Sequence, residues 1–115
     1  MKFGDSIYLC KKIQGEVEEY EAPKKIVLRR NYFSLMTSKS LKDILTYGKD
    51  IDKVYIALAP IREWGANYFK VDDKFYVDYA KPKDSEENGE SANAVITSVS
   101  YQNLFIRLVI RKTVE

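Results

Sequence analysis

Residues 54–82 read VYIALAPIREWGANYFKVDDKFYVDYAKP, and this stretch decides the fold of the chain. Its first seven residues alternate large apolar side chains with small or aromatic ones, a pattern typical of a β-strand. Asp72 and Asp73 then form a polar turn, and a second alternating segment follows at 75–78. We therefore expect two β-strands joined by an aromatic-rich connection. Trp64, in this connection, is interpreted as a plug of the core rather than a platform for a ligand.

The flanking segments carry the same period-two alternation. It predicts strands over residues 6–13, 24–37, 92–101 and 104–111. The last of them has the cleanest apolar face in the chain, made of Leu104, Ile106, Leu108 and Ile110. Gln102 and Asn103 are the predicted turn of this closing hairpin. Within 24–37 the parity changes around Arg29, Arg30 and Asn31, which predicts a β-bulge or a bend in one strand.

One short helix is expected over residues 40–48. Ser40 is suited to the N-cap, Asp43 to the first turn and Gly48 to the C-terminal cap. Its apolar stripe consists of Leu41, Ile44 and Leu45. Because two turns of helix are unstable alone, we expect the stripe to cover an open end or side of the sheet. The small face of Ala57 and Ala59 predicts close approach by this helix or another strand.

These elements predict a mainly β fold, a small antiparallel β-barrel of about six strands with one short α-helix. The chain has 115 residues, a length that fits a single β-barrel domain over 1–115. Its net charge of +2 is too small to indicate nucleic-acid binding by bulk charge. The sequence has no expected signal peptide and no apolar run of membrane-spanning length, so we expect a protein of the cytoplasm without a membrane partner.

The residue types argue against an enzyme. The chain has no histidine and one cysteine, Cys10, which excludes Ser-His and Cys-His nucleophile systems and multi-cysteine zinc sites. Cys10 is interpreted as a packing residue. Asp72, Asp73 and Asp78 match no calcium-loop spacing, and no glycine-rich phosphate loop occurs. We therefore predict no catalytic, cofactor-binding or metal-binding residues. A glycosidase-type carboxylate pair stays open, but a small barrel offers it no substrate cleft.

Two polar loops are the candidate contact segments. Residues 14–25 place a block of acids before a pair of bases: Glu16, Glu18, Glu19, Glu21, Lys24 and Lys25. This segment is either a solvated hairpin loop or a contact with neighbouring subunits through opposite charges. The second segment, at 84–91, is wholly polar, is expected to be mobile and solvated, and carries Asp84, Glu86, Glu87 and Glu90.

A small barrel that binds single-stranded nucleic acid is the alternative function. Such barrels combine stacking aromatic side chains with a basic groove. The candidate aromatic residues are Tyr8, Tyr32, Phe33, Tyr55, Tyr68, Phe69 and Tyr76. The candidate basic residues are Lys24, Lys25, Arg29 and Arg30.

The order of these segments resembles a family of small phage proteins. The relevant segments are GDSIYL at 4–9, LTYGKDID at 45–52, KVDDKFYVDYAKP at 70–82, ANAVITSV at 92–99, YQN at 101–103 and LFIRLVIRK at 104–112. Together they resemble the head–tail joining proteins of tailed bacteriophages and prophages, of the head-closure or head–tail adaptor type. The family usually has Gly-Asp where this chain has Asp72-Asp73, which is a departure from its pattern.

The resemblance implies a structural protein without enzyme activity or cofactor. It implies a homo-oligomeric ring, assembled in the host cytoplasm and then part of the virion connector, between portal or adaptor proteins and the tail. Double-stranded DNA would pass through the ring without sequence specificity. By position, 14–25 would face the channel or a neighbouring subunit, and 83–92 would contact a neighbouring ring. A monomer before assembly, and a tail-terminator or minor capsid subunit, remain alternatives.

Overall fold

The computed structural model describes residues 2–15, 17–30, 32–37, 41–84 and 87–113. The strands are β1 (Ser6–Cys10), β2 (Lys12–Ile13), β3 (Glu19–Tyr20), β4 (Lys24–Val27), β5 (Ser34–Thr37), β6 (Val54–Pro60), β7 (Lys74–Tyr76), β8 (Ala94–Gln102) and β9 (Phe105–Lys112). The helical segments are α1 (Leu41–Tyr47), the 3-10 helix η1 (Gly48–Lys53) and α2 (Ile61–Trp64). The prediction of a mainly β fold is confirmed, with a second short helix in addition to the expected one.

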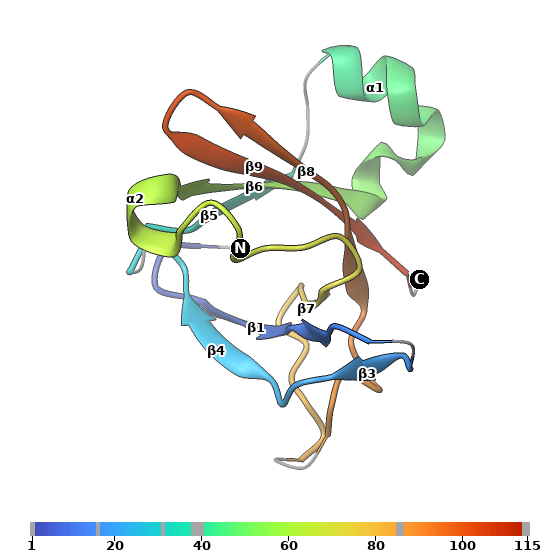
Figure 1. The fold of residues 1–115 in the computed structure, drawn as a ribbon. Helices are drawn as coiled ribbons and strands as arrows, with labels where there is room; N and C mark the ends of the chain where they lie inside the picture. The colour runs from blue at the N-terminus through green and yellow to red at the C-terminus, as the bar shows by residue number, and fades with distance from the viewer. Residues whose placement is uncertain (1, 16, 31, 38–40, 85–86, 114–115) are drawn as a thin grey trace.

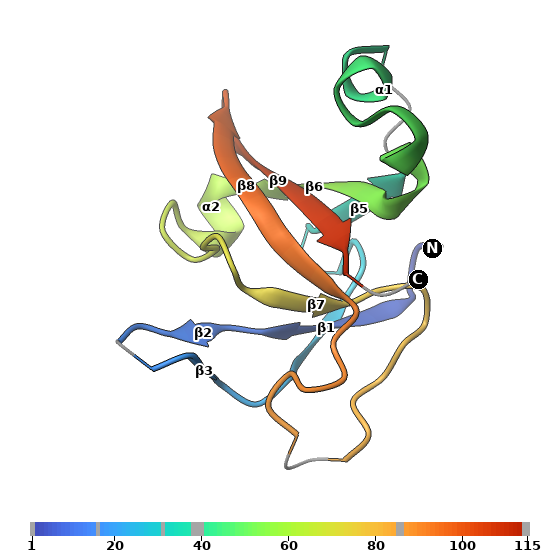
Figure 2. The same cartoon turned by 90° about the vertical axis from the view of Figure 1, so that its right-hand side faces the viewer.

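The strands form one antiparallel sheet of seven strands, in the order β4-β1-β7-β8-β9-β6-β5, and a separate pair, β2-β3. The sheet curls strongly, as Figures 1 and 2 show, but its edge strands β4 and β5 are not paired with each other. The predicted closed barrel of about six strands is therefore wrong: the sheet is open. The two edge strands are joined directly by the connection 28–33.

That connection is the segment where the sequence changes parity. A single bulged strand was expected over 24–37, but the chain leaves the sheet after β4 and re-enters it at the opposite edge as β5. Arg29 takes a positive φ of 66° and its amide donates to the Phe33 carbonyl at 2.7 Å. This local turn interrupts the strand, so the parity change separates two strands instead of bending one. The position of Asn31 lies outside the described residues.

The core lies inside the curl of the sheet. β6 places Tyr55, Ala57 and Ala59 on this inner face, all of them buried. The small alanines let the opposite wall of the sheet approach closely, as predicted for a strand. The predicted alternative, approach by the helix at this face, is wrong. Tyr47 of α1 instead packs on the outer face of the sheet, against a cluster of Val54, Ile56 and Val109.

The closing hairpin β8–β9 forms as predicted, but its turn is Asn103–Leu104, because Gln102, expected in the turn, ends β8 and pairs with Phe105. Ile106, Leu108 and Ile110 are fully buried in the core. Leu104 does not continue this face: it lies in the turn beside Asn103, whose φ is 57°, and 77% of it is exposed. A register shift between Ile96 and Ser98 changes the parity of β8, so that Val99 packs toward the core further along the strand.

The helix α1 forms where expected but does not use the predicted stripe. Ile44 and Leu45 are 43% and 77% exposed. Asp43 is buried instead, with a carboxylate oxygen 3.7 Å from the Arg107 guanidinium of β9. The prediction that the stripe covers the sheet is therefore wrong for these two residues. The N-cap Ser40 and the side chain of Leu41 lie outside the described residues.

Trp64 ends α2 at one end of the core. Its ring is half-buried and lies 6.1 Å from Phe33 and 5.3 Å from each of Tyr68 and Phe69, measured between ring centroids. It packs against the main core cluster. The interpretation of Trp64 as a plug agrees with this packing, although residues 61–64 are helical and not the expected loop.

Candidate functional site

The first predicted contact segment forms a hairpin that projects from the sheet. β2 and β3 pair through Lys12–Tyr20 and Ile13–Glu19 and extend away from the body (Figure 2). The charged residues of the segment that the structure describes are all exposed: Glu18, Glu19, Glu21, Lys24 and Lys25. Glu16 lies outside the described residues. The three glutamates are therefore presented to solvent on or beside the arm. Lys24 and Lys25 belong instead to β4 of the seven-stranded sheet.

The arm is attached to the body through Tyr20. The Tyr20 side chain is 8% exposed, and its hydroxyl donates to the Asp72 carbonyl at 3.1 Å. The Lys74 ammonium lies 4.4 Å from the centre of its ring. A cation over an aromatic face is attractive, so Lys74 adds to this attachment. The charged arm is thus held by packing at its base, while its acidic side chains are exposed and Glu18 accepts a hydrogen bond from the Tyr20 hydroxyl at 3.4 Å.

Asp73 holds the other side of the same base. Its carboxylate is fully buried and accepts hydrogen bonds from the amides of Lys12, at 2.8 Å, and Lys70, at 3.0 Å. The Lys11 ammonium also donates to it and to the Tyr68 carbonyl. The turn predicted at 72–73 is present, and Asp72 takes a positive φ of 79°. Turn chemistry does not account for Asp73, which joins β1, β2 and the turn before β7.

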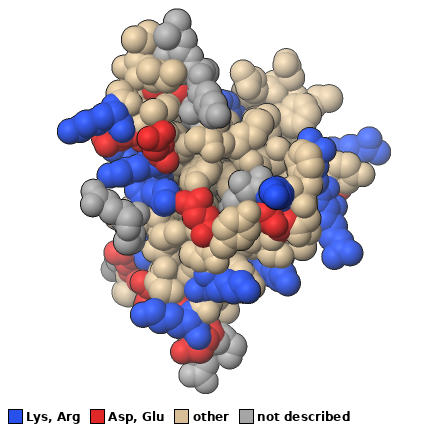
Figure 3. All heavy atoms as spheres, turned by 180° about the vertical axis from the view of Figure 1, so that it is seen from behind, with Lys and Arg blue, Asp and Glu red and all other residues tan. Residues whose placement is uncertain are grey.

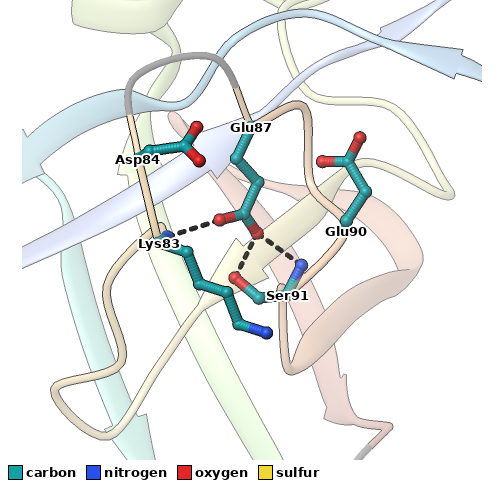
Figure 4. Close-up of a pocket in the computed structure, with 5 residues that line it drawn as sticks. All are labelled: Lys83, Asp84, Glu87, Glu90 and Ser91. Carbon is teal, nitrogen blue, oxygen red and sulfur yellow. Dashed lines mark hydrogen bonds between the residues drawn. The ribbon is translucent and has the colours of Figure 1, made fainter.

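The second predicted contact segment is held in place by Glu87. The side chain was expected to be solvated, but Glu87 is only 7% exposed. Its carboxylate accepts hydrogen bonds from the Ser91 hydroxyl and amide and from the Lys83 amide (Figure 4). The Tyr76 hydroxyl donates to it at 2.9 Å. The expectation that Glu87 is solvated is therefore wrong, because its oxygens hold the loop; its contact with a neighbouring ring stays a prediction.

The remaining members of that segment have different positions. Asp84 and Glu90 are exposed and line a surface hollow of about 380 Å³ together with Lys83, Glu87 and Ser91. Glu86 lies outside the described residues. Donors surround the Glu87 carboxylate, and the Ser91 hydroxyl contributes most to lowering its pKa, to about 2, against the opposing effect of burial. A carboxylate with so low a pKa is a poor general base at neutral pH.

The loop of Glu87 should make stability depend on pH. An unperturbed glutamate has a pKa of 4.5, and Glu87 in the folded protein has a pKa of about 2. Its stabilising effect is therefore complete above pH 4.5 and is lost as the pH falls toward 2. We expect Glu87→Gln to be less stable than the wild type at pH 7, with a difference that shrinks over this interval. Urea unfolding at several pH values measures it, and a difference that is constant with pH would contradict the assignment.

The two predicted contact segments meet at one end of the molecule. Glu18 and Glu19 of the arm and Glu90 of the loop line one hollow of about 610 Å³, with Ile13, Tyr20, Lys74 and Asn88. Three carboxylates face a single lysine there, so this surface is acidic. Lys24 and Lys25 lie on β4 outside this hollow. The structure thus brings Glu18, Glu19 and Glu90 together and separates them from the two bases.

Most of the aromatic residues proposed for nucleic-acid stacking are unavailable. Phe33, Tyr55, Phe69 and Tyr76 are at most 8% exposed and belong to the core. Tyr8 and Tyr68 are half-buried, and Tyr32 is exposed. Base stacking needs an accessible ring face, so the alternative of a single-strand-binding surface loses most of its proposed contacts.

Cys10 and the described acidic residues are candidate chemical groups for a reactive centre. Cys10 is fully buried, and burial raises the pKa of its thiol to about 11. The thiol is therefore protonated at neutral pH and is a packing residue, as expected. Within the part of the chain that the structure describes, no three His, Cys, Asp or Glu residues are placed to hold a metal ion. Among the same residues, no helix is long and apolar enough to cross a membrane.

One group of exposed apolar side chains, on β5 and α1, was not predicted from the sequence. Met36 on the edge strand β5 is 47% exposed, and the apolar residues Ile44 and Leu45 of α1 follow it along the chain. The apolar stripe of α1 could have indicated these exposed residues, but it was expected to cover the sheet.

Comparison with known proteins gives no family model, no curated protein and no solved structure that matches this chain.

Proposed function

We propose that this protein is a structural assembly protein of a tailed bacteriophage or prophage, a component of the head–tail connector without enzyme activity. In this role it joins portal-side or adaptor proteins to the tail as a homo-oligomeric ring around the passing double-stranded DNA. The segment order of the sequence suggests the family. The projecting arm of β2 and β3 is the observation that carries the proposal, because an arm of exposed charges rooted in a packed base suits contact with other subunits or a channel wall.

The charges of the arm suggest how it would act. Glu18, Glu19 and Glu21 repel the phosphate backbone, whereas Lys24 and Lys25 attract it. A channel wall that carries the acids would let DNA pass without holding it. The acidic hollow between arm and loop, with Glu90, extends the same surface. In this proposal the bases on β4 face a neighbouring subunit or the connector, and the acids face the channel.

The test is an assembly experiment with portal-complex proteins. Light scattering and negative-stain images, recorded with and without those proteins, should show the chain incorporated as a ring in their presence. A matched pair of variants tests the arm: Glu18→Lys combined with Glu19→Lys should reduce incorporation, whereas Glu63→Lys on α2 should not. Salt-sensitive binding of the free protein to a short single-stranded oligonucleotide, with no incorporation, would overturn the proposal in favour of the nucleic-acid-binding alternative.

A further inference from the structure

The two edges of the sheet are protected to very different degrees. Exposed strand edges pair readily with other chains, and proteins usually block them with charges, proline or bulges. β4 carries Lys24 and Lys25 on its exposed surface. β5, with the sequence SLMT, has no charged residue, and it pairs only with β6. Within its four residues, β5 is therefore a short edge strand that carries neither charge nor proline.

Exposed apolar side chains lie on β5 and also on α1. Met36 lies opposite Ile56 of β6, on the outer face of the sheet, and Tyr47 of α1 packs against the cluster that contains Ile56. Ile44, one helical turn before Tyr47, is 43% exposed, and Leu45 is 77% exposed. Figure 3 views the side on which β5 and α1 lie, where charged side chains stand among residues of other types. The edge strand and the helix thus each expose apolar side chains.

We propose that β5 docks a second copy of this chain through an antiparallel β5–β5 ladder about a two-fold axis. A two-fold axis brings the same surface onto itself, so uncharged residues meet uncharged residues. An axis through Met36 places it opposite Met36 of the second copy, with Leu35 opposite Thr37. None of these contacts brings like charges together. Ile44 and Leu45 extend the contact beside the ladder.

The direction of the strands favours pairing of β5 with β5 of the second copy over pairing of β5 with β4 of the second copy. Six successive antiparallel pairings lie between β4 and β5, so the two edges run in the same direction. Continuing the sheet head to tail would therefore join β5 to β4 of the next copy as a parallel ladder, which is less stable per residue than an antiparallel one. It would also place Lys24 and Lys25 against the uncharged edge. Both effects favour pairing of β5 with β5.

The first test is the mass of the free protein and of two lysine variants. We expect a dimer of twice the 13.4 kDa chain mass in light scattering at high concentration. Met36→Lys should weaken dimerisation at least about tenfold, because it sets two charges face to face. Val17→Lys is the matched control: Val17 is 65% exposed and lies between β2 and β3, which project on the opposite side from β5 (Figure 2), so its dimer should be unchanged. A wild type that stays monomeric to about 1 mM, or a dimeric Met36→Lys variant, would overturn the proposal.

The second test locates the contact without disturbing its chemistry. Met36→Cys should be cross-linked by a short bismaleimide at least about tenfold faster than Glu19→Cys, because opposite residues of an antiparallel ladder lie within about 5.5 Å. Cys10 is buried and adds little background. If Met36→Lys does not fold, hydrogen exchange of the wild type still tests the ladder. The β5 amides must exchange more slowly with solvent as the protein concentration rises. Equal cross-linking rates, or β5 exchange that is independent of concentration, would contradict the ladder. These tests use the free protein, so their failure leaves the proposed connector function untouched.

Discussion

Replacing Ile110 with aspartate is expected to leave no folded protein. Ile110 is fully buried in the core and lies on β9, between β8 and β6 at the centre of the sheet. An unpaired carboxylate in this position would cost several kcal/mol, and a domain of this size has only about 5–15 kcal/mol of stability in total. Circular dichroism and the dispersion of amide signals in NMR spectra measure the loss.

The matched control lies on the neighbouring strand of the same hairpin. Ser98 of β8 is exposed, so Ser98→Asp should fold and change the free energy of unfolding by about 0.5 kcal/mol or less. Glu18→Lys on the arm should also fold, because its side chain is in solvent. A well-folded Ile110→Asp variant would show that the parity of β9 is wrong. If Ser98→Asp lost its folded structure to the same extent as Ile110→Asp, the hairpin would tolerate no charge on either face.

Asp73→Asn is expected to cost about 3–5 kcal/mol of stability. The carboxylate is fully buried and accepts from two backbone amides and from the Lys11 ammonium, whose side chain is only 18% exposed. An asparagine removes the negative charge and turns one acceptor into a donor that faces other donors. Urea unfolding gives the difference in free energy. Because Asp73 joins the arm to the body, amides of β2 and β3 should also exchange faster with solvent.

Asp72→Asn is the control for this effect. The Asp72 side chain is 59% exposed, and its carboxylate lies 3.8 Å from the Lys12 ammonium, so the pair is a surface contact. Asparagine also tolerates the positive φ of this position, so the turn keeps its geometry. We expect a change below about 1 kcal/mol. If the two substitutions cost the same, the buried position of Asp73 does not determine its contribution.

Alternation predicted the strands best where one face of a strand is buried and the other is not. In β9 the residues Ile106, Leu108 and Ile110 are buried as expected, since a two-residue period admits only one face toward the core. In β6 both faces are apolar, and the pattern could not say which faces inward. Packing decided it: the narrow interior accepts Ala57 and Ala59, while Val54 and Ile56 lie outside against Tyr47.

The predictions that the apolar stripe of α1 covers the sheet and that the sheet forms a barrel were wrong for the same reason. An apolar side chain in a short helix indicates that something should cover it, but the pattern does not say whether the cover belongs to the same chain. Ile44 and Leu45 were assigned to the core, whereas Asp43 was the residue that turned inward, paired with Arg107. Closure of the barrel likewise depends on whether β4 and β5 meet. That distance is set by the curl of the whole sheet and not by any local segment.

The candidate site shows the same division. The sequence alone determined the charged character of the two loops, because runs without apolar residues cannot be buried as a whole. It could not identify Asp73 and Glu87 among their neighbours, since each looks like an ordinary loop acid. The folded arrangement of donors decided their roles: Lys11 and Lys12, distant in the sequence, for Asp73, and the nearby Lys83 and Ser91 together with Tyr76 for Glu87.

The sequence by itself determined the mainly β character, most strand positions, the closing hairpin and the absence of histidine chemistry. These properties follow from local alternation and from residue type. Only the tertiary structure decided that the sheet is open, that the acids of arm and loop share one surface, and that β5 and α1 expose apolar side chains. These properties depend on which segments meet in space. A contact between segments distant in the sequence produces no periodic pattern of residues in either segment.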